Sequence, residues 1–198
     1  MFLGKERQRT SEKILELARA RGALKTGDFV LSTGARSTYY FDGRLISLDP
    51  EGAALISQAV LREARDANAQ AVGGPTLGAD PIVAATVLLS QQEGTPLQGF
   101  LVRADTKAHG TRRQVEGRVE SGSRVVIVDD TCTSGSSIFT AIAAAEALGC
   151  QVAKVIAILD RMEGGGEELR RRGYNLLAFL EASPDGQVGL AREQKGGQ

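Results

Sequence analysis

Along this chain, short runs of consecutive apolar residues alternate with stretches in which apolar residues recur every three or four positions. Uninterrupted runs are typical of strands buried on both faces of a parallel sheet, and the periodic stretches are typical of helices that cover it. The predicted strands are 69–72, 98–102, 124–128, 151–159 and 175–180. The predicted helices between them are 81–89, 136–148 and 167–172. The alternation predicts an α/β fold, a mainly parallel sheet flanked by helices on both faces.

The N-terminal part follows a different pattern. A helix is predicted from about residue 10 to Gly22, because Thr10 or Ser11 can cap its start and glycine favours its end. Two short strands, 29–34 and 37–42, flank a glycine turn and form a small antiparallel piece. Pro50 then opens a helix that runs to about residue 67. The expected units are an N-terminal helix and strand pair (1–45), an α/β core (46–182) and a polar, flexible tail (183–198).

The most informative stretch follows the buried strand 124–128. Asp129 and Asp130 end that strand, and small hydroxylated residues surround Gly135 before the next helix. Backbone N–H groups in such a loop, together with those of the helix start, suit a phosphate monoester. Because carboxylates repel phosphate, the two aspartates are expected to face sugar hydroxyls or a metal-bound water. The order indicates a ribose 5-phosphate site, and an ordinary strand–turn–helix corner with solvated acids is the alternative.

Three further segments follow strands and therefore meet at the same edge of the sheet. Gly73–Gly78 is either a second anion cradle or a tight connection. The polar, basic segment 103–117 is either a flap that closes over a polyanion or a solvated surface loop. Arg161 is either a bidentate partner for a substrate carboxylate or the partner of Asp160 or Glu163.

Composition narrows the classes of function. Basic and acidic residues are balanced at 24 each, so no long-range attraction to nucleic acid or to a membrane surface is expected. Two cysteines, Cys132 and Cys150, give no disulfide framework, so reduced thiols in a cytoplasmic protein are expected. The charged N-terminus argues against a signal peptide. The chain contains no run of about 18 apolar residues, so no membrane span is predicted.

These pieces together resemble a known family. The stretch from Val125 to Ile138 resembles the phosphoribosyl pyrophosphate (PRPP) signature of type I phosphoribosyltransferases, and residues from about Lys25 to Glu163 resemble orotate phosphoribosyltransferases. The resemblance implies the type I fold, with a small N-terminal hood over the base site. It implies transfer of the 5-phosphoribosyl group from PRPP to orotate, which gives orotidine 5-monophosphate and pyrophosphate. It also implies Mg²⁺, held mainly by substrate and water near Asp129 and Asp130. A homodimer that shares the 103–117 loop between subunits is implied as well.

The resemblance also assigns roles to matching residues. The residues expected to act in catalysis are Lys107, His109, Asp129 and Asp130. The residues expected to bind PRPP are Arg103, Lys107, His109, Asp129, Asp130, Thr131, Cys132, Thr133, Ser134, Gly135, Ser136 and Ser137. The expected pyrophosphate loop is Gly74, Pro75, Thr76, Leu77 and Gly78. The residues expected to bind orotate are Tyr40, Phe41, Thr133 and Arg161.

The chain departs from the family at three positions. Some members have basic residues at the positions of Ser32, Ala104 and Gly78, so this chain has fewer cations for pyrophosphate. The candidates to replace them are Arg44, Arg112 and Arg113.

Two other functions stay open at this point. One is a phosphoribosyltransferase for a purine or for uracil, and the other is a non-catalytic PRPP-sensing regulator. Arg161 favours a carboxylated base, because a neutral base has no use for a guanidinium. The balanced charge and the lack of a helix-turn-helix pattern count against a regulator that binds nucleic acid.

Overall fold

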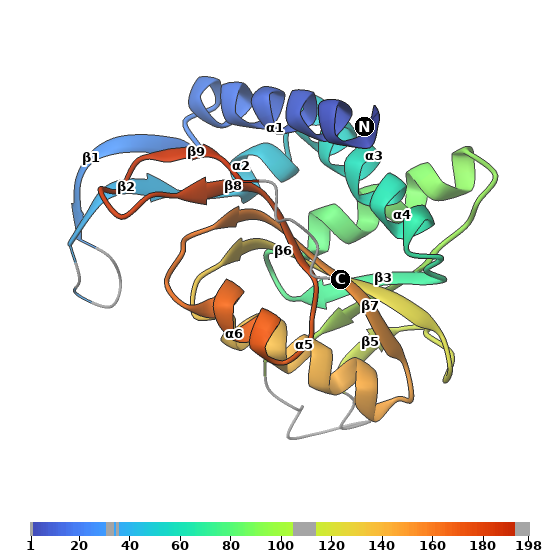
Figure 1. The fold of residues 1–198 in the computed structure, drawn as a ribbon. Coiled ribbons are helices and arrows are strands. Elements are labelled where there is room, and N and C mark those ends of the chain that lie inside the picture. The colour runs from blue at the N-terminus through green and yellow to red at the C-terminus, as the bar shows by residue number, and fades with distance from the viewer. Residues whose placement is uncertain (1, 31–33, 35, 105–113, 193–198) are drawn as a thin grey trace.

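A seven-stranded sheet with helices on both faces forms the body of the molecule (Figure 1). The computed structural model describes residues 2–30, 34, 36–104 and 114–192. The strand order is β5-β4-β3-β6-β7-β8-β9, in which β5 and β9 are antiparallel to their neighbours and the other pairs are parallel. The strands are β3 (Ala71–Pro75), β4 (Gln98–Val102), β5 (Val115–Gly117), β6 (Arg124–Cys132), β7 (Gln151–Asp160), β8 (Leu176–Ala182) and β9 (Val188–Leu190).

The helices divide between the two faces of this sheet. The helices on one face are α1 (Phe2–Ala20), α2 (Arg44–Ser47), α3 (Pro50–Asp66) and α4 (Asp80–Gln92). The helices on the other face are α5 (Ser136–Ala147) and α6 (Gly165–Arg171). Successive strand residues point to opposite faces, so Val126 and Val128 pack with the first group and Val125 and Ile127 with the second. The predicted α/β fold with a sheet covered on both faces is confirmed.

A separate two-stranded sheet, which we call the hood, stands at one end of the molecule (Figure 1). It consists of β1 (Leu24–Val30) and β2 (Arg36–Phe41), which are antiparallel, as the sequence predicted. The chain then passes through α2 into α3, whose N-terminal N–H groups are capped by Asp49: its Oδ1 accepts from the N–H groups of Glu51 and Gly52, each at 3.1 Å. Leu24, Tyr39 and Phe41 of the hood pack in the core on this face of the sheet, which holds the hood beside it.

Several predicted boundaries were wrong. The first helix begins near residue 2 rather than residue 10, the short helix α2 had no separate signal, and β6 continues through the two aspartates to Cys132. The expected polar tail is wrong for residues 188–190, which form β9 and pair with β8. Two apolar residues in a three-residue strand, Val188 and Leu190, are too short a pattern to predict pairing from sequence alone. Residues 193–198 lie outside the described residues.

None of the helices in the described part of the chain is long and apolar enough to cross a membrane.

A buried ion network joins α1, α3 and β7. Glu63 of α3 is 6% exposed and accepts hydrogen bonds from Lys154 Nζ at 2.6 Å and from Arg7, through NH2 at 2.7 Å and through Nε at 3.1 Å. Burial disfavours the carboxylate of Glu63, but the hydrogen bonds from Lys154 and Arg7 outweigh that effect and lower its pKa. The network thus holds α1 against α3 and β7, although Arg7, Glu63 and Lys154 lie far apart in the sequence. Local helix and strand propensities do not predict such a contact.

We expect Glu63→Gln to lower the free energy of unfolding by about 3 kcal/mol, because it leaves the mostly buried Lys154 without its counter-charge. Urea unfolding of the purified protein measures this value. The matched control is Glu51→Gln in the same helix, since Glu51 and its partner Arg21 are exposed and solvent screening leaves their pairing little effect on stability. Equal losses in the two variants would show that the network adds no particular stability.

Candidate functional site

The predicted phosphate cradle lies where β6 passes into α5. Gly135 caps α5 with φ = 79°, a left-handed conformation that glycine adopts without steric penalty. No side chain among the described residues caps this helix, so its first N–H groups are open to an anion. Ser134, Ser136 and Ser137 are exposed around this start. The open backbone N–H groups and the three hydroxyl groups thus lie together at the start of α5, and phosphate binding there stays a prediction.

The acidic pair stands beside this cradle, within the last residues of β6. Asp129 is 6% exposed, and its carboxylate accepts from Ser137 Oγ at 3.0 Å and from the Asp130 N–H at 2.9 Å. Burial, and after it the charge of Asp130, raises the pKa of Asp129 to about 7. Burial also raises the pKa of Asp130, an effect that Arg44 opposes and Asp42 reinforces. The two acids are therefore not solvated. This argues against the alternative interpretation, an ordinary strand–turn–helix corner with solvated acids.

Arg44 is the described cation whose charge acts on Asp130. Its guanidinium is already bound by Asp42, with Nε to Oδ1 at 2.9 Å and NH2 to Oδ2 at 3.1 Å. The pairing lowers the pKa of Asp42. Arg44 is thus held close to the acidic pair, in line with the suggestion that it replaces a missing family cation.

Glycines bring two other segments against the acidic pair. A Cβ atom built on Gly78 would lie 2.5 Å from Asp129 Oδ1 and 2.5 Å from Asp130 Oδ1. A Cβ atom on Gly43 would lie 2.7 Å from Asp130 Cβ. The loop after β3 therefore reaches the carboxylates, and a side chain at position 78 would have to displace them. This close approach gives a physical reason for the absence of a lysine at Gly78.

The five residues of the expected pyrophosphate loop divide into two groups. Gly74 and Pro75 are buried and belong to β3, so the strand is longer than the sequence indicated. Thr76 and Leu77 are exposed, and the peptide bond between them is cis. Gly78 is partly exposed next to the carboxylates. The accessible part of this loop is residues 76–78, which lie at the carboxyl end of β3.

A cavity of about 1010 Å³ separates the hood from the main sheet. Tyr39 and Tyr40 of β2 line it from one side, and Thr133 and Arg161 line it from the carboxyl ends of β6 and β7. The side chain of Arg161 is 11% exposed, and its guanidinium carbon lies 4.8 Å from the centre of the Tyr39 ring. Its Nε also donates to Glu163 at 2.8 Å. Arg161 therefore fits both interpretations. It lines a cavity, as a partner for a substrate carboxylate would, and it also pairs with a nearby acid, Glu163.

The structure separates the two aromatic residues that were expected to cover the base. Tyr40 lines the cavity beside Phe29, at 5.8 Å between ring centres, whereas Phe41 is 8% exposed and packs into the core. Tyr39, which the sequence analysis missed, lies under Arg161, and its burial raises its pKa. The alternation of β2 was the available signal, because Tyr39 and Phe41 share one face of a strand and Tyr40 occupies the other.

Most of the basic segment lies outside the described residues. That applies to Lys107, His109, Arg112 and Arg113, and to Ser32 of the hood. Arg103 is described: its N–H donates to the Gln114 carbonyl at 2.9 Å, and its guanidinium lies 3.8 Å from Glu116. The segment thus begins and ends at adjacent points beside β4 and β5.

Cys132 contributes to the site through its backbone only. Its side chain is fully buried, and burial raises the pKa of the thiol to about 12, with smaller contributions from the charges of Asp160 and Asp129. Its carbonyl accepts from the Arg161 N–H at 2.9 Å, and the Thr133 carbonyl accepts from the Gly165 N–H at 2.9 Å. Both cysteines are free thiols, as predicted. The phosphate cradle and the segment that carries Arg161 are thus tied together directly.

We expect Gly165→Ala to raise the KM for a phosphate-bearing substrate about 10-fold. The new Cβ atom would lie 2.5 Å from the Thr133 carbonyl and 2.7 Å from the Gly135 nitrogen, both of which are cradle backbone. Misplacement of backbone donors by a fraction of an ångström weakens binding by an amount on this scale. Steady-state kinetics measure the effect, with Gly189→Ala, where a Cβ atom meets nothing within 4 Å, as the control. An unchanged KM would indicate that the cradle tolerates the shift.

Known proteins are similar to this chain in sequence and in fold. The profile of the phosphoribosyl transferase domain family matches residues 83–171. An orotate phosphoribosyltransferase of Rhodopirellula baltica is 44% identical over 160 residues, which cover 78% of this chain and 83% of the relative. The chain belongs to the orotate phosphoribosyltransferase family. The family member of Aquifex aeolicus is 40% identical over 175 residues, which cover 87% of this chain and 95% of the relative.

A solved structure of the same family gives the corresponding result in three dimensions. The orotate phosphoribosyltransferase of Mycobacterium tuberculosis in complex with PRPP aligns with a TM-score of 0.69 at 30% identity, over 88% of this chain and 95% of that chain. The resemblance to orotate phosphoribosyltransferases and the type I fold, both predicted from sequence, are confirmed.

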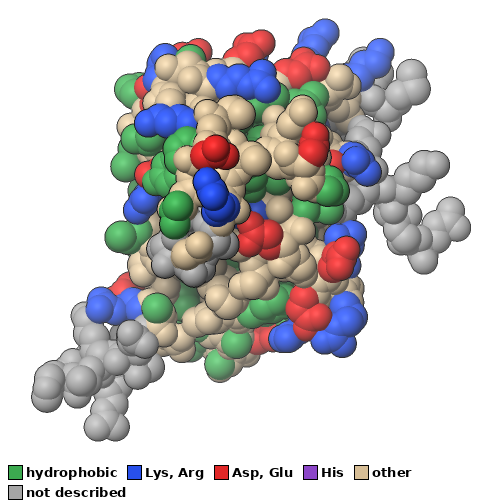
Figure 2. Space-filling model, turned by 90° about the vertical axis from the view of Figure 1, so that its left-hand side faces the viewer, with side chains coloured by type: hydrophobic (Ala, Val, Ile, Leu, Met, Phe, Trp, Pro, Cys, Tyr) green, Lys and Arg blue, Asp and Glu red, His purple; other side chains and the backbone are tan. Residues whose placement is uncertain are grey.

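The surface around the site is mixed in charge. Figure 2 looks at the end of the molecule that carries the hood, and acidic and basic side chains alternate across it. The part of this face that the structure describes lacks the broad basic surface that is typical of nucleic-acid-binding proteins.

Proposed function

We propose that this family member transfers the 5-phosphoribosyl group of PRPP to orotate and releases orotidine 5-monophosphate and pyrophosphate. The observation that carries the proposal is the direct link between the phosphate cradle and Arg161. The Arg161 N–H donates to the Cys132 carbonyl, and the Arg161 side chain lines the cavity under the hood. One rim thus offers a place for the ribose phosphate and, next to it, a guanidinium for the carboxylate of the base.

In this proposal the reaction is a displacement at C1 of the ribose. The bond from C1 to the pyrophosphate oxygen breaks, and a bond from C1 to the orotate ring nitrogen forms. The proton on the attacking ring nitrogen passes to an oxygen of the leaving pyrophosphate, which becomes basic as its bond to C1 breaks, and positioning and charge stabilisation contribute the rest of the catalysis. The start of α5 holds the 5-phosphate, Thr133 and Arg161 hold orotate, and Asp129 and Asp130 hold the ribose hydroxyls.

The residues present fit Mg²⁺ as a partner of the substrate rather than as a resident ion. Among the described residues there is no group of three or more side chains that could hold a metal. Asp129 and Asp130 provide two adjacent carboxylates whose pKa values are raised, so a positive charge nearby would relieve their repulsion. Mg²⁺ prefers oxygen ligands and keeps several waters, and when bound with PRPP it would neutralise the leaving pyrophosphate.

The basic segment completes the proposed site. Arg103, Lys107 and His109 correspond to the family's loop residues, and we propose that Lys107 steadies the leaving pyrophosphate and that His109 donates a hydrogen bond to it. A positive charge held next to the leaving pyrophosphate would stabilise the negative charge that develops on it in the transition state, and this would raise the rate.

We further propose a homodimer in which the 103–117 segment reaches the partner subunit. Four large exposed apolar side chains support it: Leu45, Leu48, Leu77 and Leu88. Leu45 lies in α2, Leu48 directly follows α2, Leu77 lies in the loop before α4 and Leu88 lies in α4. The helices α2 and α4 pack against each other. Exposed apolar residues on adjacent elements are typical of subunit interfaces. Light scattering after size-exclusion chromatography tests this directly, with Leu48→Glu expected to shift the mass toward the monomer.

The two buried free thiols are compatible with a cytoplasmic location, which we infer for this protein. The proposed partners are small molecules and a second copy of the chain, not nucleic acid or membrane.

The first test of the proposed function is an absorbance assay at the orotate band with purified protein, PRPP, orotate and Mg²⁺. We expect loss of orotate absorbance that requires both PRPP and the metal. Consumption of a purine or of uracil in place of orotate would overturn the choice of base, and PRPP binding without consumption of any base would favour a PRPP sensor.

A further inference from the structure

The turn that carries Arg161 has a backbone conformation that needs support. Met162 follows Arg161 directly and has φ = 57°, in the left-handed region. This conformation is sterically unfavourable for a residue other than glycine, and it persists only where surrounding contacts hold it. The Arg161 side chain lines the cavity between the hood and the main sheet, which we call the base cavity. The contacts that hold this turn therefore also determine where the guanidinium lies.

Two hydrogen bonds hold the turn from opposite sides. The Arg161 N–H donates to the Cys132 carbonyl at 2.9 Å, which connects the turn to the phosphate cradle. The Met162 N–H donates to Asp160 Oδ1 at 2.9 Å. Asp160 is thus the side chain that fixes the left-handed residue, and it does so from the last position of β7.

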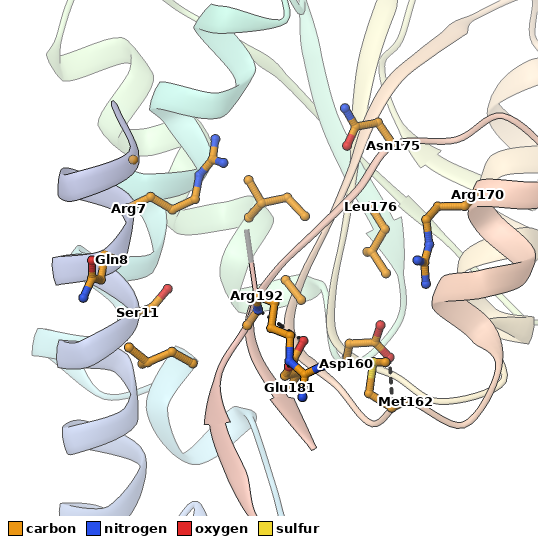
Figure 3. A pocket seen from close by; sticks show the side chains of 15 residues that line it. Arg7, Gln8, Ser11, Asp160, Met162, Arg170, Asn175, Leu176, Glu181 and Arg192 are labelled. Atoms are coloured by element: carbon orange, nitrogen blue, oxygen red, sulfur yellow. Dashed lines mark hydrogen bonds and ion pairs between the residues drawn. The ribbon is translucent and has the colours of Figure 1, made fainter. Parts of the chain in front are cut away.

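The surroundings of Asp160 leave it little freedom. The residue is 3% exposed, and a Cβ atom on Gly166 would overlap its Oδ2 atom. Burial raises the pKa of Asp160, and the hydrogen bond from the Met162 N–H and, after it, the charge of Arg170 act in the opposite direction. Figure 3 shows Asp160 next to Met162, with the Arg170 side chain extending toward it from α6. A carboxyl group enclosed in this way has little freedom to rotate, so its Oδ1 atom stays in place to accept the hydrogen bond from the Met162 N–H.

The cavity behind Asp160 does not explain this arrangement by itself. It has a volume of about 410 Å³ and lies between α1, β8 and β9 (Figure 3). Two cations at its wall already have partners: Arg7 is bound to Glu63, and Arg192 lies 3.1 Å from Glu181. Met162 lines both this cavity and the base cavity, and its hydrogen bond to Asp160 connects the two walls.

We propose that Asp160 is a positioning residue for recognition of the orotate carboxylate. It touches no substrate and acts through the Arg161–Met162 turn, which it holds so that the Arg161 guanidinium stays over Tyr39 and faces the base cavity. This inference rests on the proposed function, because it concerns the same base site. Its essential element is the acceptor atom Oδ1 and not the negative charge, since the Met162 N–H needs only an acceptor.

The test is a comparison of Asp160→Ala with Asp160→Asn in the orotate assay. Asp160→Ala removes the acceptor, and we expect the KM for orotate to rise about 10-fold while the KM for PRPP changes less than about 2-fold. Asp160→Asn keeps an oxygen at the position of Oδ1, and we expect a KM for orotate near that of the wild type. If Asp160→Ala does not fold, Asp160→Leu fills a similar volume without an acceptor and should give the same divided effect.

A double variant separates positioning from general support of the fold. If Asp160 acts through Arg161, adding Asp160→Ala to Arg161→Ala should not raise the KM for orotate further. The matched control is Glu181→Gln, because Glu181 pairs with Asp160 in the strand register and lines the same cavity but does not bond the turn. Its KM for orotate should stay unchanged.

Three outcomes would overturn the inference. They are equal rises in both KM values, equal defects in the Asn and Ala variants, and full additivity with Arg161→Ala. A wild-type protein that consumes no orotate would instead contradict the proposed function, so the two failures are distinguishable.

Discussion

Replacement of Arg161 by alanine is expected to raise the KM for orotate about 100-fold, with less than about a 3-fold change in the KM for PRPP. A guanidinium that binds a carboxylate through two parallel hydrogen bonds is among the strongest polar contacts in proteins. Its loss in a largely enclosed site costs about 2–3 kcal/mol, which corresponds to roughly 100-fold in affinity. The side chain is 11% exposed and stacks on Tyr39, so little solvent competes with that contact.

Steady-state kinetics with each substrate varied in turn measure this effect. Arg161→Lys keeps the charge but loses the planar fork, and we expect it to recover only part of the lost affinity. Glu163→Gln is the matched control on the same turn, because Glu163 occupies the Arg161 Nε in the absence of substrate. Weakening that competitor should leave the KM for orotate unchanged or lower it. An Arg161→Ala variant with unchanged affinity for orotate would contradict the assigned base.

The parts of this molecule that local sequence determines were predictable. The phosphate cradle could be located because a run of β-branched residues, two aspartates and small hydroxylated residues follow one another within a few positions. The parallel order of the central strands followed from their alternation with helices. Arg161 could be placed at the same edge, because residues that follow parallel strands emerge there.

The parts that depend on distant contacts were not predictable. The raised pKa of Asp129 comes from burial, to which the loop of Gly78 contributes although it lies about fifty positions earlier in the chain. Tyr39 was missed because the alternation of β2 separates its two faces, but how the hood docks determines which of those faces meets Arg161. The link between Met162 and Asp160 is local, but it becomes relevant only because the turn also bonds Cys132.

The acidic pair gives the second large expected effect. Asp129→Asn should lower kcat/KM for the reaction at least 100-fold, because the variant loses one of the two charges proposed to hold the ribose hydroxyls and the metal-bound substrate. The substitution is close to neutral for local structure. The Asn oxygen can accept from the Asp130 N–H, and the Asn amide can donate to Ser137 Oγ, which are the two present partners of Asp129. Orotate consumption under saturating Mg²⁺ measures the loss.

The same variant should be more stable than the wild type at pH 8. The pKa of Asp129 is about 7 in the folded protein, above its ordinary value near 4 in the unfolded chain. Between these values the folded state holds more protons than the unfolded state, so the free energy of unfolding falls as the pH rises from about 4 to about 7. Asparagine stays neutral and avoids that loss, which should stabilise the variant by at least about 1 kcal/mol at pH 8 and by little at pH 4. Urea unfolding of metal-free protein at both pH values measures the difference, with the exposed Asp66→Asn as control. A variant less stable than the wild type at pH 8 would show that ionised Asp129 supports the fold rather than opposing it.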